Sequence, residues 1–442
     1  MNEKISRKAF ISIGFMLFAM FFGSGNLIFP PMLGNQAGSS TLVSLLGFAI
    51  TAIVFPVLGI LAVAKTNGIE NLGKRVGPFF AIVYPAVVFL AIGPGIAIPR
   101  NGSLAFEMSV LPYLSQGTNL ELWRLGYTLV FFALAFYLCL QPSKLVDRIG
   151  KLMTPVLLAL ILLFFLGSVI KLPVNVADPV AGYKAPLVTG FLEGYNTMDT
   201  LAALNFGLVI SLTIRRFKVT EEKSIIKYTS LAGLLAGILL LIIYAMLAHV
   251  GKISSLGNQD VENGGRILFN VTNQVFGRGG SIVLILIFTL SCLTTVVGLI
   301  TSVSEYFARL TKGRVGYKAW TSIFTIISLG LANFGLSAIL KFSVPVLVAI
   351  YPIAIVLIIL ALLQDVFNFS SLSYKITIYS TFIISLLQGI RATGLKLNTI
   401  DPILKNIPFF EQQLEWLPVA IFFLLVGVII DNTVNRKKES IK

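Results

Sequence analysis

The chain has 442 residues, of which 56% are hydrophobic and only 12% are charged. Water-soluble domains carry about 25% charged residues, so this composition indicates an all-α integral membrane protein. With one histidine and two cysteines, the chain has neither a zinc constellation nor a histidine-based catalytic triad. The net charge of +15 comes from Lys and Arg that lie mostly between apolar runs, which favours membrane topology over nucleic-acid binding.

The first apolar run, at 10–34, is interrupted in its middle by Gly23-Ser24-Gly25-Asn26. An unwound backbone inside a bilayer leaves N–H and C=O groups that cost several kcal/mol each unless something binds them. We expect the half-helix that ends near Phe22 to offer carbonyls to a cation. The half-helix that begins near Leu27 should offer N–H groups to a carboxylate. The alternative is a simple kink, because Gly and Pro are common in membrane helices.

Eleven further runs are long enough to cross a bilayer, which takes about 20 apolar residues. They lie at 41–64, 79–111, 122–141, 153–170, 187–212, 228–250, 279–308, 317–334, 341–363, 374–390 and 415–431. The third span, at 79–111, contains Gly93-Pro94-Gly95, so we expect a kink there. Arg100 and Glu107 lie in the outer part of this span, where they are candidates for a gate; a solvated helix end is the alternative.

The sixth span, at 187–212, is also interrupted, by Gly194-Tyr195-Asn196. Glu193 and Asp199 lie on either side of this break. A carboxylate inside a membrane is costly and marks a functional site by default, so either group is a candidate proton carrier. For Glu193 the alternative is a position at the water boundary.

The eighth span, at 279–308, carries Ser291, Thr294 and Thr295. Offsets of three and four residues place these hydroxyls on one helical face. Oxygen ligands of this kind suit a hard cation such as Na⁺. The alternative is that each hydroxyl bonds back to its own helix.

Charge in the loops sets the expected topology. Loops and termini on one side of the predicted spans hold 23 of the 34 Lys and Arg residues, which places both termini in the cytoplasm. The two breaks are five spans apart, so their helices enter from opposite faces. We therefore expect one transporter domain over 1–442. It consists of an inverted repeat (about 10–170 and about 187–363) and two further helices (about 374–431).

Three segments together carry a family resemblance. They are Phe21-Phe22-Gly23-Ser24-Gly25-Asn26-Leu27-Ile28-Phe29-Pro30-Pro31, Gly93-Pro94-Gly95-Ile96-Ala97-Ile98-Pro99-Arg100 and Glu193-Gly194-Tyr195-Asn196-Thr197-Met198-Asp199. In these segments the chain resembles the bacterial branched-chain amino acid:cation symporters, over nearly its whole length. That resemblance implies the leucine-transporter fold, in which helices 1 and 6 are broken.

The resemblance also implies roles for individual residues. The substrate carboxylate would be held at the first break by the amides of Gly23 and Gly25. From the breaks themselves we also expect Ser24, and Gly194, Tyr195 and Asn196 at the second break, to bind the substrate. A first Na⁺ would bind Asn26. A second Na⁺ would bind the carbonyls of Ala19 and Phe22 together with Ser291, Thr294 and Thr295.

The expected function is uptake of leucine, isoleucine and valine by symport with Na⁺ or H⁺ across the cell membrane. We expect no enzymatic activity, no cofactor beyond the coupling ion, and no partner other than substrate and lipid. A symporter of another small solute and a channel are the alternatives. The sequence leaves open the choice between Na⁺ and H⁺, the preferred substrate and the oligomeric state.

Overall fold

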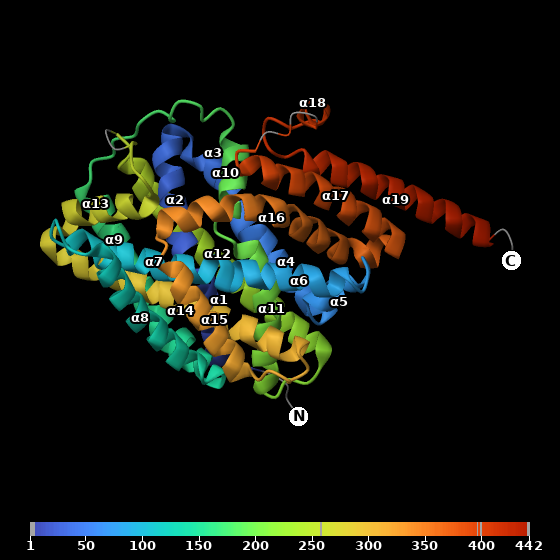
Figure 1. Cartoon of the computed structure of the whole chain (residues 1–442), viewed down its shortest axis with the longest axis horizontal. Coiled ribbons are helices and arrows are strands. Elements are labelled where there is room, and N and C mark those ends of the chain that lie inside the picture. The colour runs from blue at the N-terminus through green and yellow to red at the C-terminus, as the bar shows by residue number, and fades with distance from the viewer. Residues whose placement is uncertain (1–4, 257–258, 396, 398–399, 440–442) are drawn as a thin grey trace.

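The computed structural model describes residues 5–256, 259–395, 397 and 400–439, and all regular structure within them is helical. The helices are α1 (Arg7–Phe21), α2 (Ser24–Ala37), α3 (Thr41–Ala49), α4 (Phe55–Thr66), α5 (Ile69–Lys74), α6 (Phe80–Leu90), α7 (Ala97–Ser109), α8 (Leu120–Cys139), α9 (Thr154–Lys171), α10 (Pro186–Tyr195), α11 (Asp199–Arg216), α12 (Glu222–Ile253), α13 (Gly264–Phe276), α14 (Gly280–Leu310), α15 (Tyr317–Ala332), α16 (Leu336–Phe367), α17 (Ser371–Ala392), α18 (Asp401–Leu404) and α19 (Trp416–Glu439). Figure 1 shows how they pack side by side around α1, α11, α12 and α14.

The first predicted break separates α1 from α2. Phe22 ends the first half, and Gly23 is extended, with φ −118° and ψ −153°. The side chain of Asn26 accepts a hydrogen bond from the Gly23 amide (3.0 Å), so a donor that the helix can no longer satisfy is paired locally. The second half begins at Ser24, three residues earlier than the Leu27 expected from the sequence.

The second break separates α10 from α11, which meet at an angle of 45°. Helix α10 continues through Gly194 and Tyr195, so the break lies at 196–198, later than predicted. Gly194 stays helical and packs closely on the neighbouring helix, where an added Cβ would lie 2.9 Å from the carbonyl oxygen of Phe48. Met198 takes up the turn in a left-handed conformation (φ +68°) that is uncommon outside glycine.

The third span bends where Gly93-Pro94-Gly95 predicts a kink. The turns at Ala91–Gly95 are wider than those of an α-helix, and Gly93 has non-helical angles (φ −86°, ψ −123°). The segment packs against α14, where Val303 would be 3.0 Å from a Cβ on Gly93. The bend ends α6 and starts α7, the helix that carries Arg100 into the interior.

Helices α13, α17 and α19 are not among the ten predicted spans of the repeat. Helices α17 and α19 pack on each other and against α16, and form an arm at one edge of the molecule (Figure 1). Helix α13 was not predicted, because its 13 residues are too few to span a membrane. It packs against α2 and α14.

The helices by themselves account for fewer membrane spans than the sequence predicts. Within the described residues, seven helical stretches are long and apolar enough to cross a membrane, and an eighth if α10 and α11 form one bent span. Helices α1 and α15 have 15 and 16 residues, fewer than the roughly 20 that a straight span takes. An all-helical membrane fold is therefore confirmed, whereas twelve spans and the inverted repeat stay predictions.

Candidate functional site

The two helix breaks lie against each other in the interior. Gly25 of the first break faces Asn196 and Thr197 of the second; a Cβ added to Gly25 would lie 3.0 Å from the Thr197 Cα and 3.1 Å from the Asn196 carbonyl oxygen. Only a residue without a side chain permits this approach. The first glycine, Gly23, is equally enclosed, because a Cβ added there would lie 2.8 Å from the Thr295 hydroxyl.

A buried carboxylate lies at the junction of the breaks. Asp199 begins α11 and is 1% exposed. The Asn26 amide nitrogen donates to both of its oxygens (3.0 and 2.8 Å), and the Tyr244 hydroxyl donates to one of them (2.5 Å). Asn26 also contacts the Tyr244 hydroxyl. The network joins α2, α11 and α12, so the first break, the second break and the seventh predicted span are held together by one carboxylate.

Arg100 reaches the same place from α7. It is 2% exposed, and its guanidinium donates from Nε to the Ser24 hydroxyl (3.0 Å) and from Nη1 to the Asn196 carbonyl oxygen (2.8 Å). These two bonds tie the first break to the second. Arg100 and Glu107 were candidates for a gate, with a solvated helix end as the alternative, and no ion pair joins them among the described residues. Glu107 instead accepts a hydrogen bond from the Leu336 amide at the start of α16 (3.0 Å).

Asn101, the next residue of α7, fixes the first break from the other side. Its Oδ1 accepts from the Ser24 amide (2.8 Å), and its amide nitrogen donates to the Ala97 carbonyl (2.7 Å). The amide hydrogens of Gly23 and Ser24, which the sequence offered to a substrate carboxylate, are therefore both bonded to asparagine side chains.

Helix α14 presents its hydroxyls to the last turn of α1. Ser291 donates to the Phe22 carbonyl (2.5 Å), and Thr294 and Thr295 both donate to the Ala19 carbonyl (3.0 and 3.2 Å). Thr294 is also within bonding distance of the Ser291 carbonyl (3.0 Å), as a hydroxyl bonding back to its own helix would be. All five predicted residues thus lie together, three hydroxyls and two carbonyls from two helices.

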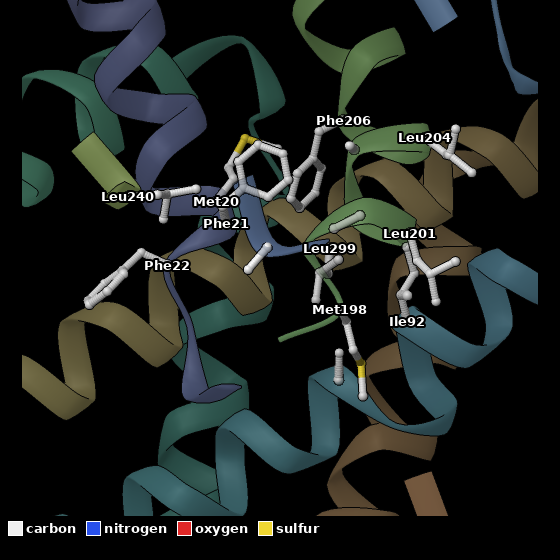
Figure 2. Close-up of a cluster of buried hydrophobic side chains, with 14 of the residues drawn as sticks. Met20, Phe21, Phe22, Ile92, Met198, Leu201, Leu204, Phe206, Leu240 and Leu299 are labelled. Atoms are coloured by element: carbon white, nitrogen blue, oxygen red, sulfur yellow. The ribbon is translucent and has the colours of Figure 1, made fainter. Parts of the chain in front are cut away.

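Between the breaks lies a cavity of about 20 Å³. Its polar lining includes Arg100, Asn101, Asp199 and Thr295. Its apolar lining consists of Met20, Phe21, Ile92, Ala97, Met198, Ala202, Phe206 and Leu299. Figure 2 shows many of these apolar side chains gathered around the broken helices, and the rings of Phe21 and Phe206 meet edge to face at 5.2 Å. This volume admits one water or one bare cation but no amino acid.

Some predicted site residues lie away from this cavity. Gly194 packs against α3, and the Tyr195 ring stacks on the Tyr351 ring with 4.2 Å between the ring centroids. Asn196 contributes its backbone carbonyl, which accepts the hydrogen bond from Arg100. Glu193 is half-buried and does not line the cavity.

Two residues of the site were missed from the sequence, Asn101 and Tyr244. Tyr244 is a polar group at the end of the apolar run Leu239-Leu240-Leu241-Ile242-Ile243, which was the available signal. Asn101 follows Arg100 within a span, and a polar pair inside a membrane helix is as strong a signal as a single charge.

Comparison with known proteins identifies the family. The family model described as branched-chain amino acid transport protein matches residues 6–434. The chain belongs to this family. It is 38% identical to the branched-chain amino acid permease BraB of Bacillus subtilis, with 99% of each chain covered. It is also 38% identical to the branched-chain amino acid transport system 2 carrier protein of Pseudomonas aeruginosa, with 98% of each covered. Such relatives are named as permeases and carriers, not as enzymes.

Solved structures share the fold. A nucleobase-cation-symport-1 family transporter, crystallised closed with bromovinylhydantoin bound, superposes with a TM-score of 0.58 at 13% identity, covering 97% of this chain and 93% of that one. A manganese transporter of Eremococcus coleocola superposes with a TM-score of 0.55 at 14% identity, covering 97% and 95%. At this level of identity the likeness establishes the fold alone. It confirms the leucine-transporter fold that the family resemblance implied.

Proposed function

We propose that this protein imports leucine, isoleucine and valine across the cell membrane by symport with Na⁺, with both termini in the cytoplasm. Membership of the branched-chain amino acid transport family supports the substrate class. The apolar lining around the breaks supports an aliphatic side chain, because Met20, Phe206 and Leu299 offer it contacts without polar partners.

One observation carries the choice of Na⁺. The carbonyls of Ala19 and Phe22 and the hydroxyls of Ser291, Thr294 and Thr295 converge between α1 and α14. Every atom that could coordinate the ion is an oxygen, the ligand type that a hard cation prefers. A Ser or Thr hydroxyl rotates freely, so each can turn a lone pair toward an ion in place of donating to a carbonyl. An ion held there would join α1 to α14 and would favour the conformation in which the two helices touch.

The test separates the two gradients. Purified protein in liposomes should take up labelled leucine when a Na⁺ gradient alone is imposed, and much less when a pH gradient alone is imposed. Leucine affinity should rise with Na⁺, and leucine should raise Na⁺ affinity by the same factor, as linkage requires. Uptake that follows the pH gradient and ignores Na⁺ would overturn the choice of ion and leave the family assignment intact.

Proton symport is the second candidate, and Asp199 is the observation in its favour. This carboxyl group is buried in the interior between two broken helices, where taking up a proton would remove an expensive charge. Under this alternative, leucine uptake depends on pH in the wild type and loses that dependence in Asp199→Asn.

A further inference from the structure

Two opposite charges face one cavity without touching. Arg100 and Asp199 are 2% and 1% exposed, and both line the space between the breaks. The ion pairs found among the described residues do not include this pair. Of the described residues that line the cavity, only these two carry a charged side chain. Buried charges that are left apart are costly, so the arrangement is poised for a ligand that carries both charges.

The guanidinium has donors left for an anion. Arginine has five N–H groups, and the hydrogen bonds described above for Arg100 come from Nε and Nη1 and go to neutral oxygens, a hydroxyl and a carbonyl. Nη2 lies next to Gly25, 2.7 Å from where a Cβ would be. The outer edge of the fork, formed by Nη1 and Nη2, matches the two oxygens of a carboxylate.

Two backbone amides at the first break already have partners. The amides of Gly23 and Ser24 are bonded to Asn26 and Asn101, so these two donors are not free for a substrate carboxylate. Arg100 is held beside these amides by its own bond to the Ser24 hydroxyl. The guanidinium is thus positioned to supply donors in place of these two amides.

The carboxylate of Asp199 can take one more donor. Its Oδ2 accepts from Asn26 and Tyr244, whereas Oδ1 accepts from the Asn26 side chain. A carboxylate oxygen accepts two hydrogen bonds, so Oδ1 can accept an ammonium N–H without disturbing the network.

We propose that Arg100 and Asp199 bind the two charged groups of an α-amino acid. The guanidinium of Arg100 binds its carboxylate, and the carboxylate of Asp199 binds its ammonium group. This rests on the proposed function, because it assigns the head-group contacts of that same substrate. The cavity must widen to admit the ligand, and the aliphatic side chain then lies among Met20, Phe206 and Leu299. Each half of the zwitterion is required, so compounds that lack either charge are rejected.

The experiment measures competition with labelled leucine on the purified full-length protein. Leucinamide lacks the carboxylate, and 4-methylpentanoate lacks the amine. In the wild type we expect each to bind at least about 10-fold more weakly than leucine, which is the lower end of the range for losing a hydrogen bond to a charged group. In Arg100→Gln, leucine should weaken to within about threefold of leucinamide, since the group that tells them apart is gone. In Asp199→Asn, the corresponding gap between leucine and 4-methylpentanoate should close.

Arg124→Gln is the matched control, because Arg124 also donates to a backbone carbonyl (Asn333, 3.1 Å) but lies outside the cavity. It should keep both discrimination ratios. If Arg100→Gln does not fold, Arg100→Lys keeps the charge and removes the fork, and should narrow the leucine–leucinamide gap. Wild-type protein that binds all three compounds equally refutes the zwitterion proposal while leaving the transporter standing. Wild-type protein that binds no branched-chain amino acid refutes both.

Discussion

Replacing Gly25 with alanine tests whether the two helix breaks must touch. The added Cβ would lie 2.7 Å from Arg100 Nη2, 3.0 Å from the Thr197 Cα and 3.1 Å from the Asn196 carbonyl oxygen, whereas ordinary contacts lie at 3.4–4 Å. Two of these three neighbours are backbone atoms, which cannot rotate away. Overpacking of this kind costs about 1–3 kcal/mol, or roughly 5- to 150-fold in an equilibrium constant.

We therefore expect Gly25→Ala to raise the KM for leucine at least about fivefold in proteoliposomes, because the breaks are forced apart where they frame the cavity. Gly126→Ala in α8 is the control. A Cβ added to Gly126 would have nothing within 4 Å, and alanine favours a helix there. Both variants should elute as intact protein from size-exclusion chromatography. A Gly25→Ala protein that transports leucine with an unchanged KM would refute the contact between the breaks.

Three further predictions concern the ion site, the substrate and stability. Thr294→Val removes a hydroxyl with little change of shape and should lower the apparent Na⁺ affinity of leucine uptake at least about tenfold. The control is Thr301→Val, two turns along α14, which should leave the Na⁺ affinity unchanged. Equal effects of the two variants would argue against a Na⁺ site at Thr294. Excess isoleucine should compete with labelled leucine while glutamate and lysine should not, because their charged side chains would enter an apolar lining unpaired; equal competition by glutamate would exclude that lining. Glu415→Ala leaves Arg391 without its buried partner and should lower the free energy of unfolding by about 3 kcal/mol. Glu222→Ala should leave the free energy of unfolding nearly unchanged, because water screens its exposed pair with Arg215, and thermal unfolding can measure this contrast.

Local rules were enough for some of the site. A glycine pair followed by Asn26 breaks a helix because the backbone can unwind there and the asparagine can pair the released amide, as it does with Gly23. The hydroxyls of α14 lie on one face because a helix repeats every 3.6 residues, so their spacing alone put Ser291, Thr294 and Thr295 together. The exact ends of the breaks were less predictable. Gly194 lies within its helix, and the close approach of a neighbouring helix leaves no room for a side chain there, which nothing in its own segment reveals.

Long-range packing decided the rest. Asp199 meets Asn26 across 173 residues of chain and Tyr244 across 45, and Arg100 meets Ser24 across 76. No periodicity links such positions, because which side chains face each other depends on how helices cross and on where they bend. The sequence made Arg100 a candidate for a gate with Glu107, with a solvated helix end as the alternative. In the structure the bend at Gly93 separates α6 from α7, and the guanidinium of Arg100 lies between the two breaks. The chain by itself thus determined an all-helical membrane protein with two interrupted helices, since both features follow from composition and local backbone chemistry. Only the tertiary structure placed the guanidinium of Arg100 and the carboxylate of Asp199 around one cavity. That placement depends on how α2, α7, α11 and α12 pack against one another.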